Sequence, residues 1–186
     1  MTDTELKRFL DAQAARFDNP DFIAEDPISI PHRFSRPDDI AIAGFLAATI
    51  AWGQRKSIVK SANQLINWMD GAPHDFVTNC TEAELQPFER FVYRTFNGTD
   101  CTTFLRSLHN IYMNHGGLEQ VVTEGFKSLG TIRGALSHFY RVFFEIDHQH
   151  RTEKHLANPD KGSASKEGPP YGNTTAALLS CRGQRP

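Results

Sequence analysis

The residues best suited to contact a ligand lie at a short polar junction between two stretches of different character. Gln54, Arg55 and Lys56 follow Gly53, at the end of a run that carries no charge from Ile40 onward. If a helix begins here, its free backbone N–H groups and positive dipole potential, together with two cations, could hold a phosphate. A helix–helix corner with solvated charges accounts for the same spacing, so both interpretations stay open.

A second polar run, residues 147–155, contains three histidines in the order H-x-H-x4-H. Imidazoles at such spacing can bind a transition metal, but no further ligand group accompanies them, and we predict no metal site. The cations in and after this run are better suited to phosphate contact. The candidates are Arg151, Lys154, His155 and Lys161. Among all these interpretations, we favour an ordinary solvated connection for the run.

Four aspartates flank predicted helix ends and are the carboxylates available for acid–base chemistry: Asp38, Asp39, Asp75 and Asp100. His74 precedes Asp75, but adjacent residues of a helix point about 100° apart, which is poor geometry for a His–Asp relay. Spacing selects none of these residues, so we assign no catalytic residue and expect no cofactor.

Two predicted helices position the Gln54 junction. The first begins near Asp38, a good N-cap, and is apolar on every side, which indicates burial on every side. It is too short to cross a bilayer, which takes roughly 20 apolar residues. The second has apolar residues at one-sided helical spacing, namely Ile58, Ala62, Leu65, Ile66 and Met69. We therefore predict a buried central helix, followed by a turn out of the core at Gly53.

Further helices are predicted over most of the remaining chain. Helical spacing and capping signals mark residues 4–17, 73–79, 81–90, about 100–114, 118–129 and 131–146. The stretch 26–34 is interrupted by prolines, which predicts an extended strap laid across the helices. Because no segment alternates with period two, we expect an all-α fold without a sheet.

Composition favours a folded domain and gives no general signal for nucleic acid. The 186-residue chain is 39% hydrophobic with 14 Phe, which is enough for an aromatic core. Its net charge is −2, so a DNA-binding face would have to be local. Cys80, Cys101 and Cys181 lack metal-ligand or disulfide spacing. The charged N-terminus lacks the apolar core of a signal peptide. These features predict a cytoplasmic protein without a membrane anchor.

Four motifs suggest a family. The chain from Asp26 to about Ser165 resembles a bacterial family of uncharacterised proteins marked by DPI-x-IPHRF, AAT-x-AWGQR, APHDF and RT-x-KH. Here these motifs stand at residues 26–34, 47–55, 72–76 and 151–155. The resemblance covers most of the chain.

The helix pair around Gln54 also remotely resembles the start of the helical barrel in helix-hairpin-helix DNA glycosylases of the endonuclease III type. That resemblance implies an orthogonal multi-helix bundle, in which Gln54 enters the duplex beside a flipped base. Those enzymes carry a catalytic aspartate later in the chain, and this sequence lacks its equivalent. The resemblance therefore implies a glycosylase-like protein that is catalytically incomplete.

The composition changes at Gly162, after which large apolar residues are few and no helical period is visible. We predict a helical domain over residues 1–161 and a disordered tail over residues 162–186. In the resembled family a Lys-Arg pair and a long apolar helix follow, whereas here Lys166 is followed by Glu167. We therefore expect that the tail comes from a truncated or frameshifted reading frame.

One functional hypothesis and two rivals follow. The first is a DNA-binding, glycosylase-like domain in which Gln54 probes the duplex, while phosphates are contacted by Arg55, Lys56, Arg151 and Lys154. The alternative is a helical protein-interaction module without enzymatic activity, which binds a protein partner or a second copy through uncovered apolar surface. The third is a hydrolase or metalloprotein that uses the histidine run.

Overall fold

The structure, a computed structural model, describes residues 1–18 and 20–161. It is helical almost throughout, which confirms the predicted all-α class. The α-helices are α1 (Asp3–Phe17), α2 (Asp21–Glu25), α3 (Pro37–Thr49), α4 (Arg55–Trp68), α5 (Pro73–Asn79), α6 (Gly98–Asn114), α7 (Leu118–Leu129) and α8 (Ile132–Phe143). The 3-10 helices are η1 (Pro27–Ser29), η2 (Pro31–Arg33), η3 (Glu82–Arg90) and η4 (His150–His155). The tail predicted at residues 162–186 lies outside the described residues.

Two expectations about local structure are wrong. The expected absence of a sheet is contradicted by a small antiparallel hairpin, in which β1 (Val92–Tyr93) pairs with β2 (Phe96–Asn97). The proline-rich stretch 26–34 is not an extended strap but contains η1 and η2. A proline stands at the start of each of these short helices, where its missing N–H is not needed.

Helix α3 is the buried centre of the molecule, as the sequence predicted. It begins slightly earlier than expected, with Arg36 as the N-cap, so Asp38 lies in the first turn instead of capping the helix. A carboxylate in the first turn still interacts favourably with the helix dipole. Every residue from 42 to 47 is buried, and α3 packs against α4, α5, α7, η1 and η2. Its apolar residues therefore find neighbours on several sides.

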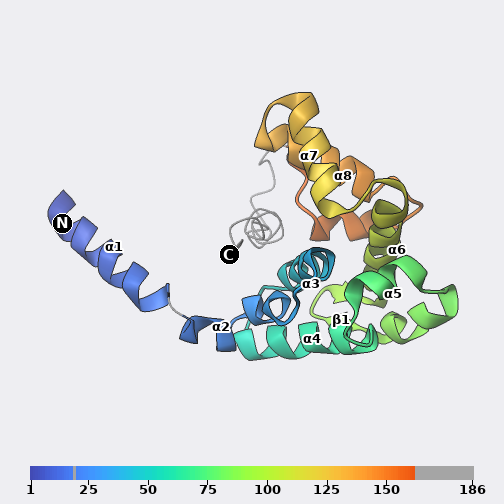
Figure 1. The fold of residues 1–186 in the computed structure, drawn as a ribbon, viewed down its shortest axis with the longest axis horizontal. Helices are drawn as coiled ribbons and strands as arrows, with labels where there is room; N and C mark the ends of the chain where they lie inside the picture. The colour runs from blue at the N-terminus through green and yellow to red at the C-terminus, as the bar shows by residue number, and fades with distance from the viewer. Residues whose placement is uncertain (19, 162–186) are drawn as a thin grey trace.

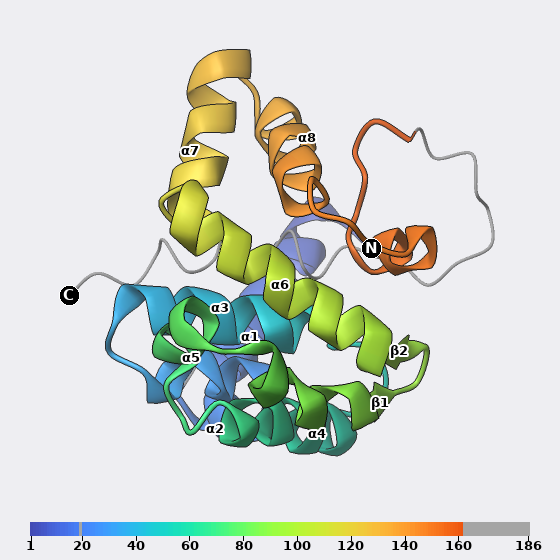
Figure 2. The same cartoon turned by 90° about the vertical axis from the view of Figure 1, so that its right-hand side faces the viewer.

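Phenylalanine rings hold α6 and α8 against this central helix. The Phe45 ring of α3 lies 5.9 Å from Phe104 of α6 and 5.4 Å from Phe143 of α8, measured between centroids. Phe104 and Phe143 are themselves 4.8 Å apart. Figure 2 shows α6 running between the α7–α8 pair and the group formed by α3, α4 and α5. Aromatic pairs of this kind contribute about 0.5–1.5 kcal/mol each beyond the area they bury.

Helix α1 lies apart from this packing. Figure 1 shows it extending away from the other helices beyond α2, and none of its residues is buried. A capping box begins the helix, because the Glu5 N–H donates to Thr2 Oγ1 and the Thr2 N–H donates to Glu5 Oε2. The predicted apolar face is exposed at Leu6, Phe9, Leu10 and Phe17. In the described ranges, no helix has both the length and the apolar character needed to span a bilayer.

Candidate nucleic-acid interface

The chain leaves α3 and turns outward at Gly53. The φ angle of Gly53 is +120°, a conformation that residues with a side chain rarely adopt. Gln54 is extended and forms the N-cap of α4, but its side chain makes no capping hydrogen bond. Gln54, Arg55 and Lys56 are all exposed. The first backbone N–H groups of α4 therefore lie at the surface beside the Gln54 amide and two cations.

A groove of about 600 Å³ lies against this end of α4. It is lined by residues of α2, of α4 and of the junction between α3 and α4: Ala24, Glu25, Gln54, Arg55, Lys56, Val59, Lys60 and Asn63. Three of these side chains are cationic and one is anionic, so the groove is locally positive although the whole chain carries a net charge of −2. The three junction residues identified in the sequence share this concave surface.

Arg55 lies over α2. Its guanidinium carbon is 5.0 Å from the ring centroid of Phe22, and its Nε is 3.6 Å from Asp26 Oδ2. The Arg55 side chain is 54% exposed, so this ion pair contributes little to stability. A guanidinium stacked on an aromatic ring keeps N–H groups at its edge for another acceptor. Among the described residues, Lys56 and Lys60 form no ion pair with a carboxylate.

The β1–β2 hairpin contacts the junction from a different direction. The Tyr93 hydroxyl donates to the carbonyl oxygen of Trp52 at 2.8 Å. The Arg94 guanidinium carbon lies 5.2 Å from the centroid of the Trp52 ring. A methyl group added to Gly53 would lie 2.6 Å from Arg94 Nη2. Glycine at position 53 is thus favoured by its φ angle, whereas the Arg94 guanidinium ends a flexible side chain that could shift.

The predicted phosphate contact Arg151 also lies against the hairpin. Its guanidinium donates to Asn97 Oδ1 at 3.0 Å and to the carbonyl oxygen of Thr95 at 3.3 Å. It also lies 3.3 Å from Asp100 Oδ2. These three contacts occupy much of the guanidinium, so Arg151 fastens η4 to the hairpin. The hairpin in turn contacts the Gln54 junction, which joins two regions that are far apart in the sequence.

Asp100 is fully buried at the centre of a polar network between α6 and η4. Its Oδ1 accepts from the Thr152 hydroxyl at 2.8 Å, and its Oδ2 accepts from the Asn97 N–H at 3.0 Å. His155 Nε2 lies 3.3 Å from the same Oδ2. Burial acts to raise the pKa of Asp100, but hydrogen bonds with His155, Asn97 and Thr152 lower it to about 2. Because His155 is buried in this network, its expected contact with phosphate is wrong.

Several polar side chains around η4 converge on Glu153. Its carboxylate accepts from the Tyr140 hydroxyl at 2.6 Å and from Lys161 Nζ at 3.2 Å, and His150 Nδ1 lies 2.7 Å away. The Tyr140 hydrogen bond, supported by those from Lys161 and His150, lowers the pKa of Glu153 to about 2 against the effect of burial. Lys161 is exposed, and its ammonium group forms an ion pair with Glu153. In the part of the chain that the structure describes, no cluster of three His, Cys, Asp or Glu side chains is placed to hold a metal ion.

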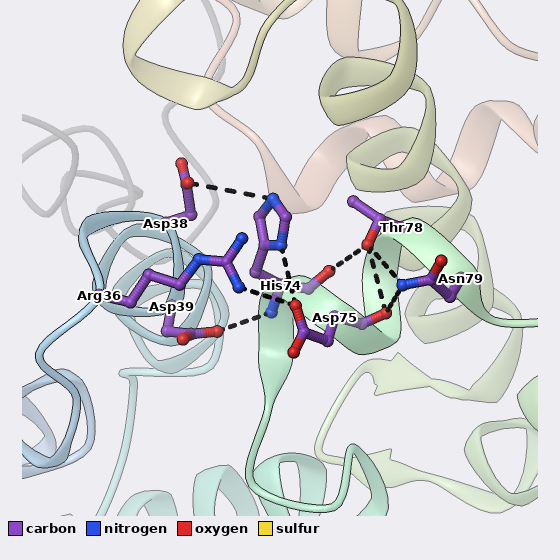
Figure 3. Close-up of polar contacts among 7 residues, drawn as sticks. All are labelled: Arg36, Asp38, Asp39, His74, Asp75, Thr78 and Asn79. Atoms are coloured by element: carbon purple, nitrogen blue, oxygen red, sulfur yellow. Dashed lines mark hydrogen bonds and ion pairs between the residues drawn. The ribbon is translucent and has the colours of Figure 1, made fainter.

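A separate polar cluster joins the N-termini of α3 and α5 (Figure 3). Asp39 Oδ1 accepts the backbone N–H of His74 at 2.8 Å, and Arg36 Nη1 donates to Asp75 Oδ1 at 2.7 Å. The His74 ring lies 3.4 Å from Asp75 and 3.9 Å from Asp38, too far for the strong hydrogen bond of a catalytic relay. The cluster caps α5 and ties it to α3.

Sequence reasoning did not assign three residues that lie in or beside the groove: Lys60, Asn63 and Arg94. The first two carry a usable signal, because they follow Lys56 by four and seven residues and so share its helix face. Arg94 carries no comparable signal. It projects from a two-residue turn whose place in the fold depends on contacts with Trp52.

The fold and the groove define an all-helical domain with a cation-lined concave surface. A family model described as "Protein of unknown function (DUF2400)" matches residues 26–168, which is more than half of the chain. The chain belongs to this family. Searches of curated proteins and of solved structures returned no match.

Proposed function

We propose that this protein binds nucleic acid through the groove at the N-terminus of α4. The observation that carries the proposal is the shared concave surface, which combines a helix N-terminus, the exposed amide of Gln54 and the cations Arg55, Lys56 and Lys60. Backbone N–H groups and cations at a helix N-terminus are well suited to phosphate. Gln54 is the side chain that reads or probes the bases, and the flanking cations contact the backbone.

The other two predicted phosphate contacts have different places in this proposal. Lys154 is exposed on η4 and is kept as a contact to phosphate. Arg151 acts through its hydrogen bonds to the hairpin, so its main contribution is to hold the hairpin beside the Gln54 junction. Loss of Arg151 would thus disturb the interface even where its own charge never meets a phosphate.

The proposal assigns DNA binding of a glycosylase-like kind and no bond cleavage. None of the four aspartates considered from the sequence lines the groove. Asp100 is buried, and the other three belong to the cluster at the start of α3 and α5. A flipped base in the groove would thus meet Gln54 but none of these four aspartates, which fits a catalytically incomplete domain.

Alanine substitution at Arg55 or Lys56 tests the proposal. Fluorescence anisotropy with a labelled DNA duplex, read between 50 and 200 mM salt (roughly the range over which counterion release is resolved), gives the slope of log K against log salt. Each substitution should reduce that slope by about 0.9 and weaken binding equally on unrelated sequences. Lys127→Ala, in the last turn of α7, is the matched control. Absence of salt-dependent binding by the unaltered chain would refute the proposal.

A second candidate function is a protein-interaction module, and α1 is the observation that favours it. Its apolar residues Phe9 and Leu10 are each 54% exposed, and within residues 1–18 and 20–161 no residue of this helix is buried. A helix of 15 residues is only marginally stable in water without packing. A protein partner or a second copy that covers this face would stabilise it.

A further inference from the structure

The cations beside the groove continue past both ends of its lining. At one end, Arg33 Nη1 of η2 donates to Asn63 Oδ1 at 2.8 Å, and Asn63 lines the groove. At the other end, the Arg94 guanidinium lies on Trp52 and against Gly53, directly before Gln54. Three segments far apart in the sequence, η2, α4 and the hairpin, thus place cations in the groove and beside its two ends.

The charges at the two ends are not neutralised within the described residues. Arg33 is held by a neutral amide and Arg94 by an indole ring, and neither forms an ion pair with a carboxylate there. Other surface arginines differ: Arg36 pairs with Asp75, and Arg106 pairs with Glu82. Both end residues are exposed, so their guanidinium groups present an uncompensated positive charge to a ligand.

The backbone at Arg94 supports a role beyond packing. Arg94 has φ +54°, the left-handed region, which is uncommon and costly for a residue other than glycine. Residues held in such conformations cluster at functional sites. Here the conformation turns the chain so that two neighbouring side chains both contact Trp52. The Tyr93 hydroxyl donates to the Trp52 carbonyl oxygen, and the Arg94 guanidinium lies over the Trp52 ring. The hairpin thereby holds one cation at the edge of the Gln54 junction.

Spacing along α4 indicates the size of the ligand. Lys56, Lys60 and Asn63 are related by four and then three residues, so they form one stripe on the helix. From the start of α4 to Asn63 the helix rises by about 12 Å. A nucleic-acid strand whose backbone runs along this stripe therefore places more than one phosphate against it. A single phosphate or mononucleotide would leave Arg33 or Arg94 without a partner.

We infer that the groove binds an extended sugar–phosphate backbone, which runs along α4 from Arg94 to Arg33, and that these two arginines are binding residues. The inference rests on the proposed function and extends it by naming the length and direction of the ligand. Glu25 lines the same groove, and its negative charge would repel the phosphates of a bound strand. Its presence predicts that Glu25→Gln strengthens binding, the opposite sign to the arginine substitutions.

The test uses the full chain and a labelled 20-nucleotide probe, as a single strand and as a duplex. Arg33→Ala and Arg94→Ala should each weaken binding about three- to eightfold near 100 mM salt and lower the salt slope by about 0.7 to 0.9. Arg106→Ala, a paired arginine on α6, should change neither. Arg94→Lys keeps the charge and should keep the slope, and thermal unfolding of each variant separates lost binding from lost folding.

Several outcomes overturn the inference while leaving the proposed function intact. One is salt-dependent DNA binding that Arg33→Ala and Arg94→Ala leave unchanged. Another is equal competition by a mononucleotide, because the ligand would then be short. Equal competition by polyglutamate would instead identify an acidic peptide as the ligand and overturn the choice of nucleic acid. If neither probe binds the unaltered chain, the proposed function itself fails.

Discussion

Asp100 links several distant positions of the fold. Its carboxylate accepts a hydrogen bond from the Thr152 hydroxyl and lies 3.3 Å from both Arg151 Nη1 and His155 Nε2. All three residues come more than fifty positions later in the chain. A buried carboxylate left without these partners would be strongly destabilising, since breaking a buried pair costs about 3–5 kcal/mol. The RT-x-KH segment therefore serves the fold first, and it supports the interface by fixing the hairpin.

The low pKa of Asp100 predicts a loss of stability in acid. The pKa rises from about 2 in the folded chain to the ordinary 3.8 on unfolding, so the unfolded state binds more protons in this range. The stabilisation is complete above pH 3.8 and is lost as the pH falls through about 2. Equilibrium urea unfolding should show a loss of about 2 kcal/mol between these limits from this group.

Asp100→Asn provides the comparison for that measurement. The variant should be about 3 kcal/mol less stable near neutral pH, because Arg151 loses its counter-charge and the buried contacts with Thr152 and His155 are weakened. It should also lose less stability in acid, since the titrating group is gone. Asp11→Asn removes an exposed i,i+4 partner of Lys7 and should change stability by no more than about 0.5 kcal/mol. Equal acid sensitivity of Asp100→Asn and the unaltered chain would contradict this account.

Residue types alone located three residues that share the groove, but they did not reveal the internal partner of Arg151 and His155. Gln54, Arg55 and Lys56 stand out in sequence because a charge-free run stops immediately before them. Arg151 and His155 look like equally good phosphate contacts, yet their partner is a buried aspartate. Nothing local to residues 151–155 reveals that partner, because the contact spans more than fifty residues and depends on how η4 meets α6.

At the scale of elements, the helices follow from patterns within the sequence, and the hairpin does not. Periodicity located α4 and α7, and a charge-free apolar run located α3. The hairpin has only two residues per strand, too short for a period-two pattern to be visible. Its formation depends on Tyr93 and Arg94 meeting Trp52, which is a tertiary contact. Proline spacing likewise located η1 and η2 but gave the wrong conformation.

The exposed face of α1 gives a prediction at this same scale. If a second copy covers the face, Phe9→Asp should shift the molar mass measured by light scattering from a dimer to a monomer, because a charge opposes burial. Asp11→Asn, on the same helix, is the control and should leave the mass unchanged. A monomer for the unaltered chain across the micromolar range would argue against self-association through α1 and leave a different protein as its partner.

At the scale of the whole molecule, the buried helix α3 ends just before Gln54, whose exposed side chain makes no capping hydrogen bond. Gln54 lines a positive groove on a protein whose net charge is −2. The core fixes this arrangement, because α3 is packed by several elements before it turns outward at Gly53. The hairpin and η4 support the junction through Trp52 and Arg151. The local positive potential and the negative total charge together favour ligand contact at one face over non-specific adhesion.

Backbone NMR during titration with a DNA oligonucleotide tests this central claim most directly. The account predicts salt-sensitive shift changes concentrated at Gly53, Gln54, the first two turns of α4 and the turn at Arg94, with a change at the indole N–H of Trp52. Residues of the cluster at His74 should remain unaffected at the same DNA concentrations. Shift changes confined to α1 or to the His74 cluster, or none at low salt, would contradict the account.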